Sequence, residues 1–368
     1  MGSIRLAVDT GGTFTDITVL EEDTGTVSIA KVPSRRDDPS GALIEAVGKG
    51  LEIANVDATD VTLLVHGTTI ITNAVLENKL PGTSLITTEG FRDVLEIGRH
   101  FRPDMYDLQQ DKTPPLVPRE RRFCVAERTT SEGEVLVTPK REEVRQLVEE
   151  IRENNSNAVS VCFLNAFINP TNEILVRDWL KAELSEVRVS TSHEVCPEIR
   201  EFERMSTVAL NAATIPLMAA YLAEVTPRIQ ATLPNAKVLL MQSNGGSLTV
   251  EAAREFPVRL ITSGPAGGAL AVQRLGKATG KDNLLGVDMG GTSTDISLIY
   301  KGETRMTTES TIAEHPVKLP MIEINSIGAG AGSIAWLDNW GGLHVGPRAP
   351  APIRVLPLTA AVAPNRRS

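Results

Sequence analysis

An octapeptide that occurs twice in the chain carries the residues best suited to phosphate chemistry. Residues 9–16 and 288–295 are identical at six of eight positions, and both copies begin and end with aspartate. Each copy holds a pair of glycines, which we expect to turn the backbone through positive φ and to expose its N–H groups to a ligand. Two ordinary structural hairpins are the alternative, but the repetition favours a pair of phosphate-binding turns.

Hydroxyl side chains flank the glycines in both copies and can donate hydrogen bonds to phosphate oxygens. The predicted phosphate-binding residues are Thr10, Gly11, Gly12, Thr13, Thr15, Gly290, Gly291, Thr292 and Ser293. The leading aspartates, Asp9 and Asp288, each end an apolar run beside the turn. Carboxylate oxygens suit Mg²⁺, so we expect both aspartates to act in catalysis by holding this ion against the phosphates, directly or through water.

Strand-like runs on both sides of each octapeptide must position these turns. Apolar residues precede the two copies at 4–8 and 284–287, and others follow them at 17–20 and 296–300. Two such runs joined by a Gly-Gly turn are typical of a β-hairpin. We therefore predict two hairpins, each with an aspartate at the end of its first strand.

A further candidate group lies where a predicted strand, residues 61–66, leads into a helix. The strand ends at His66, and Thr68 and Thr69 fall in the first turn of the helix. Hydroxyl residues at such a junction either cap the helix or contact a ligand, because open α/β sheets bind ligands at this edge. His66 is therefore a candidate catalytic residue, and Thr68 and Thr69 are candidate substrate ligands.

Two other polar residues are candidate substrate ligands. Arg99 opens a Pro-rich excursion over residues 99–122, where a solvated basic turn is the alternative interpretation. Asn244 follows a predicted strand that ends in a Gly-Gly turn. The helix of small residues that begins at Ser263 would let two backbones approach closely, either at a domain crossover or against a ligand.

The middle of the chain alternates between strand and helix patterns, which indicates a mainly parallel sheet with crossover helices. The predicted strands are residues 83–88, 158–164 and 187–192, and the predicted helices are residues 140–153 and 170–185. Glu201 and Arg204 are three residues apart and are expected to form a surface ion pair.

Composition narrows the function classes. The chain has 368 residues, enough for two or three domains, and its net charge of −9 argues against nucleic acid or an anionic membrane as a partner. We expect no apolar stretch of the roughly 18 residues that span a membrane, and no leader sequence. The three cysteines lack metal-ligand spacing and are expected to be reduced, so the cytoplasm is the predicted location.

Several stretches together resemble the hydantoinase/oxoprolinase family, in particular the ATP-dependent hydantoinase A (N-methylhydantoinase A) type. This family is related to actin, sugar kinases and heat-shock chaperone ATPases. The stretches that carry the resemblance are residues 8–16, 66–69 with 72–73, 85–99, 241–246, 263–266, 288–295 and 327–330. They occur in the family order, and as a set they are highly specific.

The resemblance implies an α/β, actin-like (ribonuclease H-like) ATPase fold of two lobes, with ATP and Mg²⁺ held between the two turns. It implies a hydrolase that opens a cyclic amide such as hydantoin, N-methylhydantoin or oxoproline through phosphoryl activation of the ring amide. A second subunit of the hydantoinase B type is the implied partner. The alternatives are an ATP-dependent ketone carboxylase subunit, a sugar-kinase-like module with Asp93 as its base, and a truncated, non-catalytic nucleotide-binding remnant.

The resemblance also suggests domain boundaries. Residues 1–196 would form the first lobe and residues 197–346 the start of a truncated second lobe. Residues 347–368 contain five prolines and four arginines but no acidic residue. We expect this segment to be a disordered or out-of-frame tail.

Overall fold

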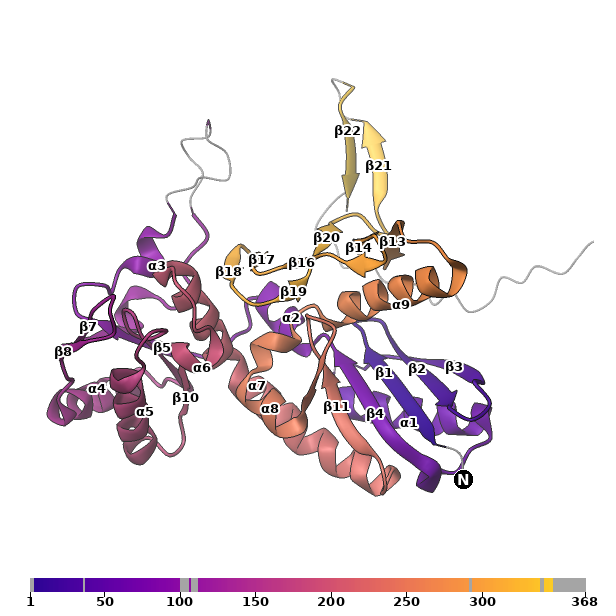
Figure 1. Ribbon diagram of the computed structural model, residues 1–368, viewed down its shortest axis with the longest axis horizontal. Helices are drawn as coiled ribbons and strands as arrows, with labels where there is room; N and C mark the ends of the chain where they lie inside the picture. The colour runs from indigo at the N-terminus through magenta and orange to yellow at the C-terminus, as the bar shows by residue number, and fades with distance from the viewer. Residues whose placement is uncertain are drawn as a thin grey trace, which may run out of the picture.

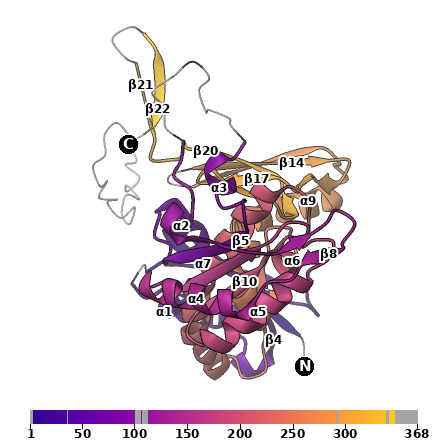
Figure 2. The same ribbon diagram turned by 90° about the vertical axis from the view of Figure 1, so that its left-hand side faces the viewer.

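The computed structural model describes residues 3–35, 37–99, 106, 112–290, 293–337 and 341–346. These residues form a mixed α/β structure in which three sheets have four or more strands (Figure 1). The hairpin formed by β21 (Ile334–Leu337) and β22 (Leu343–Gly346) projects away from the rest of the described chain in both views (Figure 2).

A six-stranded sheet carries the first octapeptide. Its strand order is β12-β11-β4-β1-β2-β3, with β1 parallel to β4 and antiparallel to β2. The strands are β1 (Ile4–Thr10), β2 (Phe14–Glu21), β3 (Val27–Pro33), β4 (Val61–Thr68), β11 (Lys237–Met241) and β12 (Ser247–Thr249). Helix α1 (Pro39–Ala54) covers one face of β1, β2 and β3, as the alternation of buried and exposed residues along β1 requires.

A separate parallel sheet is formed by the middle of the chain, as predicted. Its strand order is β10-β9-β5-β6, and every pair is parallel. Its elements are β5 (Thr83–Thr88), β6 (Arg122–Val125), β9 (Ala158–Cys162), β10 (Arg188–Thr191), α4 (Arg141–Glu153) and α5 (Thr171–Glu183). Helix α4 buries Val144, Leu147, Val148 and Ile151, the apolar side of its helical repeat.

A small sheet carries the second octapeptide and is packed on one face only. It consists of β13 (Leu284–Met289), β14 (Thr294–Tyr300), β15 (Glu303–Thr304) and β20 (Ile324–Ile327). Helix α9 (Ser263–Thr279) packs against β13 and β14. On the opposite face Leu285, Val287, Met289, Leu298 and Tyr300 are exposed.

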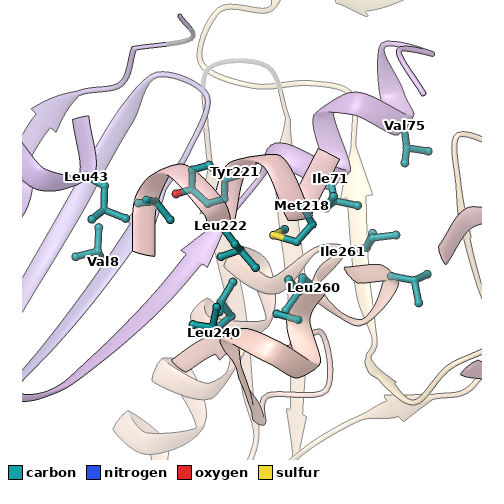
Figure 3. Packing of buried hydrophobic residues seen from close by; sticks show 14 of the residues in the cluster. Val8, Leu43, Ile71, Val75, Met218, Tyr221, Leu222, Leu240, Leu260 and Ile261 are labelled. Carbon is teal, nitrogen blue, oxygen red and sulfur yellow. The ribbon is translucent and has the colours of Figure 1, made fainter. Parts of the chain in front are cut away.

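The central element is the long helix α7 (Glu201–Thr232). It contacts strands β5, β9 and β10 of the parallel sheet, and it also contacts helices α1 and α2 (Ile70–Leu76), which lie beside the six-stranded sheet. Figure 3 shows Met218, Tyr221 and Leu222 of this helix in the main core. By length and composition α7 could cross a membrane, contrary to the sequence expectation, but 67% of its apolar window is buried inside the structure. The core helix of a globular protein meets the same test.

Shorter elements complete the described structure. They are η1 (Ala58–Asp60), α2 (Ile70–Leu76), α3 (Val94–Ile97), η2 (Arg119–Arg121), β7 (Arg128–Thr129), β8 (Val135–Val137), α6 (Ser192–Val195), α8 (Val250–Glu255), η3 (Pro257–Leu260), β16 (Met306–Thr307), β17 (Ser310–Ile312), β18 (His315–Val317), β19 (Met321–Ile322), β21 (Ile334–Leu337) and β22 (Leu343–Gly346).

The six-stranded sheet takes strands from both sides of residue 196, so this sheet extends beyond the lobe predicted to end there, and the boundary stays a prediction. One sequence expectation needs correction. Arg204 forms no surface pair with Glu201. Its side chain is fully buried and donates to the carbonyl oxygens of Phe163 (2.6 Å) and Glu198 (3.1 Å), which compensate for its burial. The tail, residues 347–368, lies outside the described residues.

The unequal packing of the two hairpins has a measurable consequence. The core beneath β1 and β2 is large, whereas the core under α9 consists of Ala266, Ala269 and Ile322 with two partly buried neighbours. We predict that the amides of β13 and β14 exchange with deuterium more than about tenfold faster than those of β1 and β2. Hydrogen exchange read by mass spectrometry measures this, and equal protection of both hairpins would contradict it.

Candidate functional site

The two octapeptides form hairpins with the same register. Asp9 pairs with Asp16 across β1 and β2, and Asp288 pairs with Asp295 across β13 and β14. The sequence repeat is therefore a structural repeat, and both predicted hairpins are confirmed. Each leading aspartate lies two residues before its turn.

The turns close in the same way but not with the expected backbone conformation. The N–H group of Gly11 donates to Phe14 O (3.0 Å), and that of Gly290 donates to Ser293 O (2.9 Å). Positive φ was predicted, yet neither Gly11, Gly12 nor Gly290 adopts it. A Cβ atom on Gly11 would lie 3.1 Å from Phe14 O, and one on Gly12 would meet nothing within 4 Å. Glycine thus relieves crowding at one position and leaves open space for a ligand at the next.

A segment beyond the hairpin supports the first turn. Ser34 donates from its N–H to Thr13 O (2.9 Å) and from its hydroxyl to Gly11 O (2.8 Å). The hydroxyl of Thr15 is buried and lies 3.0 Å from Ser34 Oγ, so Thr15 contacts this support rather than open space. Thr13 itself is exposed on the turn.

The second turn is supported in a similar manner. The Ala331 N–H donates to Gly290 O (2.9 Å), and the Thr294 hydroxyl donates to Ala329 O (2.6 Å). Two predicted phosphate ligands of this turn, Gly291 and Thr292, lie outside the described residues.

Asp9 is the electrostatic centre of the site. It is accessible to solvent, but protein surrounds it on most sides, and this desolvation raises the pKa of its carboxyl group. The negative charges of Asp16 and Asp288 raise the pKa of Asp9 further. Asp288 belongs to the second hairpin, and helix α9, whose first turn approaches Asp9, packs on β13 of that hairpin. Both hairpins therefore lie at the same end of α9.

Two glycines from other elements make room for the Asp9 carboxylate. A Cβ atom on Gly67, at the end of β4, would lie 2.6 Å from Asp9 Oδ1. A Cβ atom on Gly264, in the first turn of α9, would lie 3.4 Å from Asp9 Oδ2. The close approach predicted for the small-residue helix is therefore made to Asp9, a contact that the sequence did not reveal.

Two hydroxyl groups on residues that adjoin Asp9 and Gly264 in sequence are buried without a partner in the described part of the chain. They are Thr10 Oγ1, on the residue after Asp9, and Ser263 Oγ, on the residue before Gly264. Buried hydroxyls are normally hydrogen-bonded, so both are candidate contacts for a ligand or an ordered water.

The residues present fit Mg²⁺ bound with a nucleotide. The described residues contain no cluster of three or more His, Cys, Asp or Glu side chains, which a protein-only metal site would need. Mg²⁺ instead uses one or two carboxylates together with phosphates and water. Asp9 and Asp288 would supply those carboxylates, and the ion would offset the repulsion that raises the pKa of Asp9.

Thr68 and Thr69 lie beside the first hairpin. The N–H and hydroxyl of Thr69 lie 3.3 and 3.2 Å from Thr10 O, to which both donate. Thr68 is buried, and its Oγ1 accepts from the N–H of Ile70 (3.3 Å). These threonines therefore connect the start of α2 to the end of β1.

His66 is buried beneath the site rather than open to it. Its Nδ1 lies 3.2 Å from Val8 O and its Nε2 lies 2.7 Å from Tyr221 Oη. Burial lowers the pKa of His66 to about 4. With both ring nitrogens engaged and 1% of its surface exposed, the side chain is placed to join β1 to α7 rather than to touch substrate. Its catalytic role stays a prediction without geometric support.

The structure does not bring Arg99 or Asn244 to the hairpins. Arg99 forms a two-pronged ion pair with Glu203 (2.7 and 2.8 Å) and lines a separate cleft of about 1,020 Å³. Asn244 lines a smaller cavity of about 270 Å³. His100 and Arg102, which follow Arg99, lie outside the described residues.

Asp93, the candidate base of a sugar kinase, is paired with cations. Its carboxylate accepts from Arg119 Nε and Nη2 (3.0 and 3.1 Å). This hydrogen bonding lowers the pKa of Asp93, which makes the group a weaker base. The geometry argues against the kinase alternative.

Comparison with protein families decides the relationship. The model of the hydantoinase/oxoprolinase N-terminal region matches residues 5–184, and the hydantoinase/oxoprolinase model matches residues 204–362. The chain belongs to the hydantoinase/oxoprolinase family. The second match extends into the segment 347–368, which we expected to lie outside the family pattern.

Relatives in this family include hydrolases of cyclic amides. The caprolactamase alpha subunit of Pseudomonas jessenii is 34% identical over 94% of this chain and 50% of its own length. The 5-oxoprolinase 1 of Arabidopsis thaliana is 31% identical over 94% of this chain and 29% of its own length. The chain thus spans about half the length of the first and less than a third of the second.

Solved structures of relatives confirm the α/β, actin-like ATPase fold. The crystal structure of the ATP-dependent caprolactamase from Pseudomonas jessenii matches 95% of this chain and 51% of its own with a TM-score of 0.83. Nucleotide-free acetone carboxylase, which is 27% identical, matches 94% of this chain and 51% of its own with a TM-score of 0.81.

The space beside Asp9 can be tested by filling it. Gly67→Ala places a methyl group against Asp9 Oδ1, so we predict that Mg-ATP affinity falls about tenfold or more. Gly48→Ala is the control, because a Cβ there meets nothing within 4 Å on the exposed side of α1. It should leave affinity unchanged and add about 0.5–1 kcal/mol of stability. Calorimetric titration and thermal unfolding measure both, and unchanged affinity in Gly67→Ala would contradict the assignment.

The buried imidazole predicts a pH dependence of stability. The unfolded chain binds a proton at His66 near pH 6.5, whereas the folded chain does so only near pH 4. Stability should therefore fall as pH drops from about 6.5 towards 4, by up to about 3 kcal/mol from this group. Denaturant unfolding of the wild type and His66→Gln should show a shallower decline for the variant. Identical slopes would show that His66 is not the titrating group.

Proposed function

We propose that the chain binds Mg-ATP between its two hairpins and is the ATP-using part of a hydrolase that opens a cyclic amide, such as hydantoin, N-methylhydantoin or oxoproline. The observation that supports this most directly is the pair of hairpins of identical register, each with an aspartate before its turn, which helix α9 connects. The family relationship to ATP-dependent caprolactamase and to oxoprolinases supports the class of substrate.

The proposed chemistry explains how a ring amide, which water attacks only slowly, can be hydrolysed. A ring amide resists water because its carbonyl carbon is a weak electrophile and its oxygen is a poor leaving group. Transfer of the γ-phosphoryl group forms a bond from phosphorus to the amide oxygen and breaks the bond to the β-phosphate, releasing ADP. Water can then attack the ring carbon, and the C–N bond breaks, which leaves the ring nitrogen as an amine and the carbon as an acyl phosphate. A second water hydrolyses the acyl phosphate to the carboxylate and releases phosphate.

The chain's own residues would serve this chemistry by positioning and by charge. The N–H groups of both turns would hold the phosphates in the open space before Gly12. Asp9 and Asp288 would hold Mg²⁺, which supplies charge neutralisation when bound. Gly67 and Gly264 leave room for the Asp9 carboxylate. Ser34 and Thr69 hold the first turn and the end of β1 through hydrogen bonds.

We further propose a hydantoinase B type subunit as partner. The caprolactamase relative is named as an alpha subunit, which supports a multi-subunit assembly. Because this chain spans about half of that relative, turnover is proposed for the assembly rather than for this chain alone. The cytoplasmic location stays a proposal, which cell fractionation with an antibody against the chain would test.

The second candidate function is an ATP-dependent ketone carboxylase subunit. The structural similarity to acetone carboxylase favours it, and the same hairpins would bind ATP in that case. Phosphate release that requires bicarbonate and a ketone would identify this function. A non-catalytic nucleotide-binding remnant would instead bind Mg-ATP without turnover in any assembly.

If Asp9 belongs to the Mg-ATP site, Asp9→Asn should have opposite effects on the thermal stability of the free and the liganded protein. Asp9→Asn removes a desolvated negative charge and its repulsion from Asp16 and Asp288, so the free protein should melt at a higher temperature than the wild type at pH 7. Mg-ATP should raise the melting temperature of the wild type but not that of the variant. Differential scanning fluorimetry measures both effects. An Asp9→Asn protein with a full Mg-ATP shift would show that this carboxylate is not part of the site.

Turnover distinguishes the candidate functions. With the partner subunit present, we expect phosphate release to depend on a cyclic amide, such as hydantoin, oxoproline or caprolactam, and to fall at least about a hundredfold in Asp288→Asn. A coupled phosphate assay measures the rate, and Asp57→Asn, a change on a surface loop, is the matched control. Release that responds only to bicarbonate with a ketone would overturn the hydrolase assignment.

A further inference from the structure

A second cavity opens at the same edge of the six-stranded sheet as the first turn. It has a volume of about 270 Å³ and is lined by four segments distant in sequence, residues 195–198, 242–244, 259 and 318–320. The segment 242–244 follows β11, and only β4 lies between β11 and β1. Two strand spacings, about 10 Å, therefore separate this part of the cavity from the end of β1.

The cavity carries an excess of positive charge. Lys318 is 6% exposed, and its Nζ lies 3.3 Å from both Glu198 Oε2 and Ile199 O. Arg259 is half-buried, with its guanidinium 5.0 Å from the ring of Phe256. No carboxylate in the described structure pairs with Arg259. Glu198 is the one acidic residue among the described residues that line the cavity, so one cation remains uncompensated.

Neighbouring groups hold Arg259 in position and add a neutral donor. The N–H and hydroxyl of Ser243 both donate to Arg259 O, at 2.8 and 2.6 Å. Asn244 uses its Oδ1 to accept from the N–H of Gly246 (2.8 Å). Its Nδ2 group makes no hydrogen bond within the described residues and is free to donate. Arginine, lysine and amide donors together are suited to a carboxylate.

Most of the remaining wall of the cavity is apolar. It consists of Val195, Pro197, Leu319 and Pro320, and Cys196 and the polar Gln242 complete it. A cavity with apolar walls and a few convergent polar groups is typical of a site for a small organic molecule rather than for a bare inorganic ion. The volume suits a ligand about the size of a five-membered ring with one substituent.

We propose that this cavity binds the carboxylate of a cyclic amide acid, so that the substrate of this chain is an anionic rather than a neutral ring. The carboxylate contacts Arg259, Lys318 and Asn244, and the ring packs on the apolar wall, about 10 Å from the phosphate-binding edge. This inference rests on the proposed cyclic-amide function and adds the charge of the substrate to it. It also gives a purpose to Asn244, which the hairpins do not use.

A matched pair of ligands tests the proposal. Calorimetric titration of the full chain with 5-oxoproline should show binding, whereas 2-pyrrolidinone, the same ring without the carboxylate, should bind about tenfold or more weakly. In Arg259→Met the affinity for 5-oxoproline should fall about 10- to 100-fold. Arg274→Met removes an exposed arginine from α9 and should leave that affinity unchanged. Melting temperatures confirm that each variant is folded.

Several results would overturn the proposal. They are absence of 5-oxoproline binding to the wild type, equal affinity for the two rings, and undiminished binding of 5-oxoproline by Arg259→Met. Bicarbonate that binds with the same dependence on Arg259, while 5-oxoproline does not bind, would assign the cavity to an inorganic anion instead. Mg-ATP titrated on the same preparation tests the hairpin site separately, so the two proposals can fail independently.

Discussion

The rest of this structure depends on one carboxylate, that of Asp9, which protein surrounds on most sides. This desolvation raises the pKa of Asp9, and the negative charges of Asp16 and of Asp288, which belongs to a hairpin almost 280 residues further along the chain, raise it further. Such an arrangement is unfavourable in the free protein and becomes favourable when a cation binds between the carboxylates. To keep these like charges near each other, the protein must hold both hairpins in position. The sheets and helices around the hairpins provide this support.

The support for the two hairpins is unequal. β1 lies inside the six-stranded sheet, above a large core that includes α7, and Ser34 and Thr69 brace its end. The small sheet packs mainly on α9, over a core of few residues, and leaves an apolar face exposed. α9 joins the two halves of the site, because its first turn contacts Asp9 while its length packs on β13 and β14. Movement of α9 would therefore change the separation of the two aspartates.

The sequence predicted those parts of the structure that repeat or alternate locally. The duplicated octapeptide led to both hairpins, and apolar periodicity led to the parallel sheet and its helices. It did not predict the contacts of Gly67 and Gly264 with Asp9, since a glycine does not show in sequence which distant side chain needs its space. The sequence likewise did not show that His66 and Arg204 are buried, because the carbonyl groups and the hydroxyl that bond to their side chains come from distant segments. Nor did the sequence predict that β11, which lies beyond the boundary predicted at residue 196, returns to the first sheet.

The most direct test of the account is a double-mutant cycle on Mg-ATP affinity with Asp9→Asn, Asp288→Asn and the double variant, measured by calorimetry at saturating Mg²⁺. If both aspartates hold one ion, the effects will not add, and the coupling free energy will exceed about 1 kcal/mol. A parallel cycle of Asp9→Asn with Asp57→Asn should be additive. Effects of Asp9→Asn and Asp288→Asn that add to within about 0.5 kcal/mol would contradict a shared site between the hairpins.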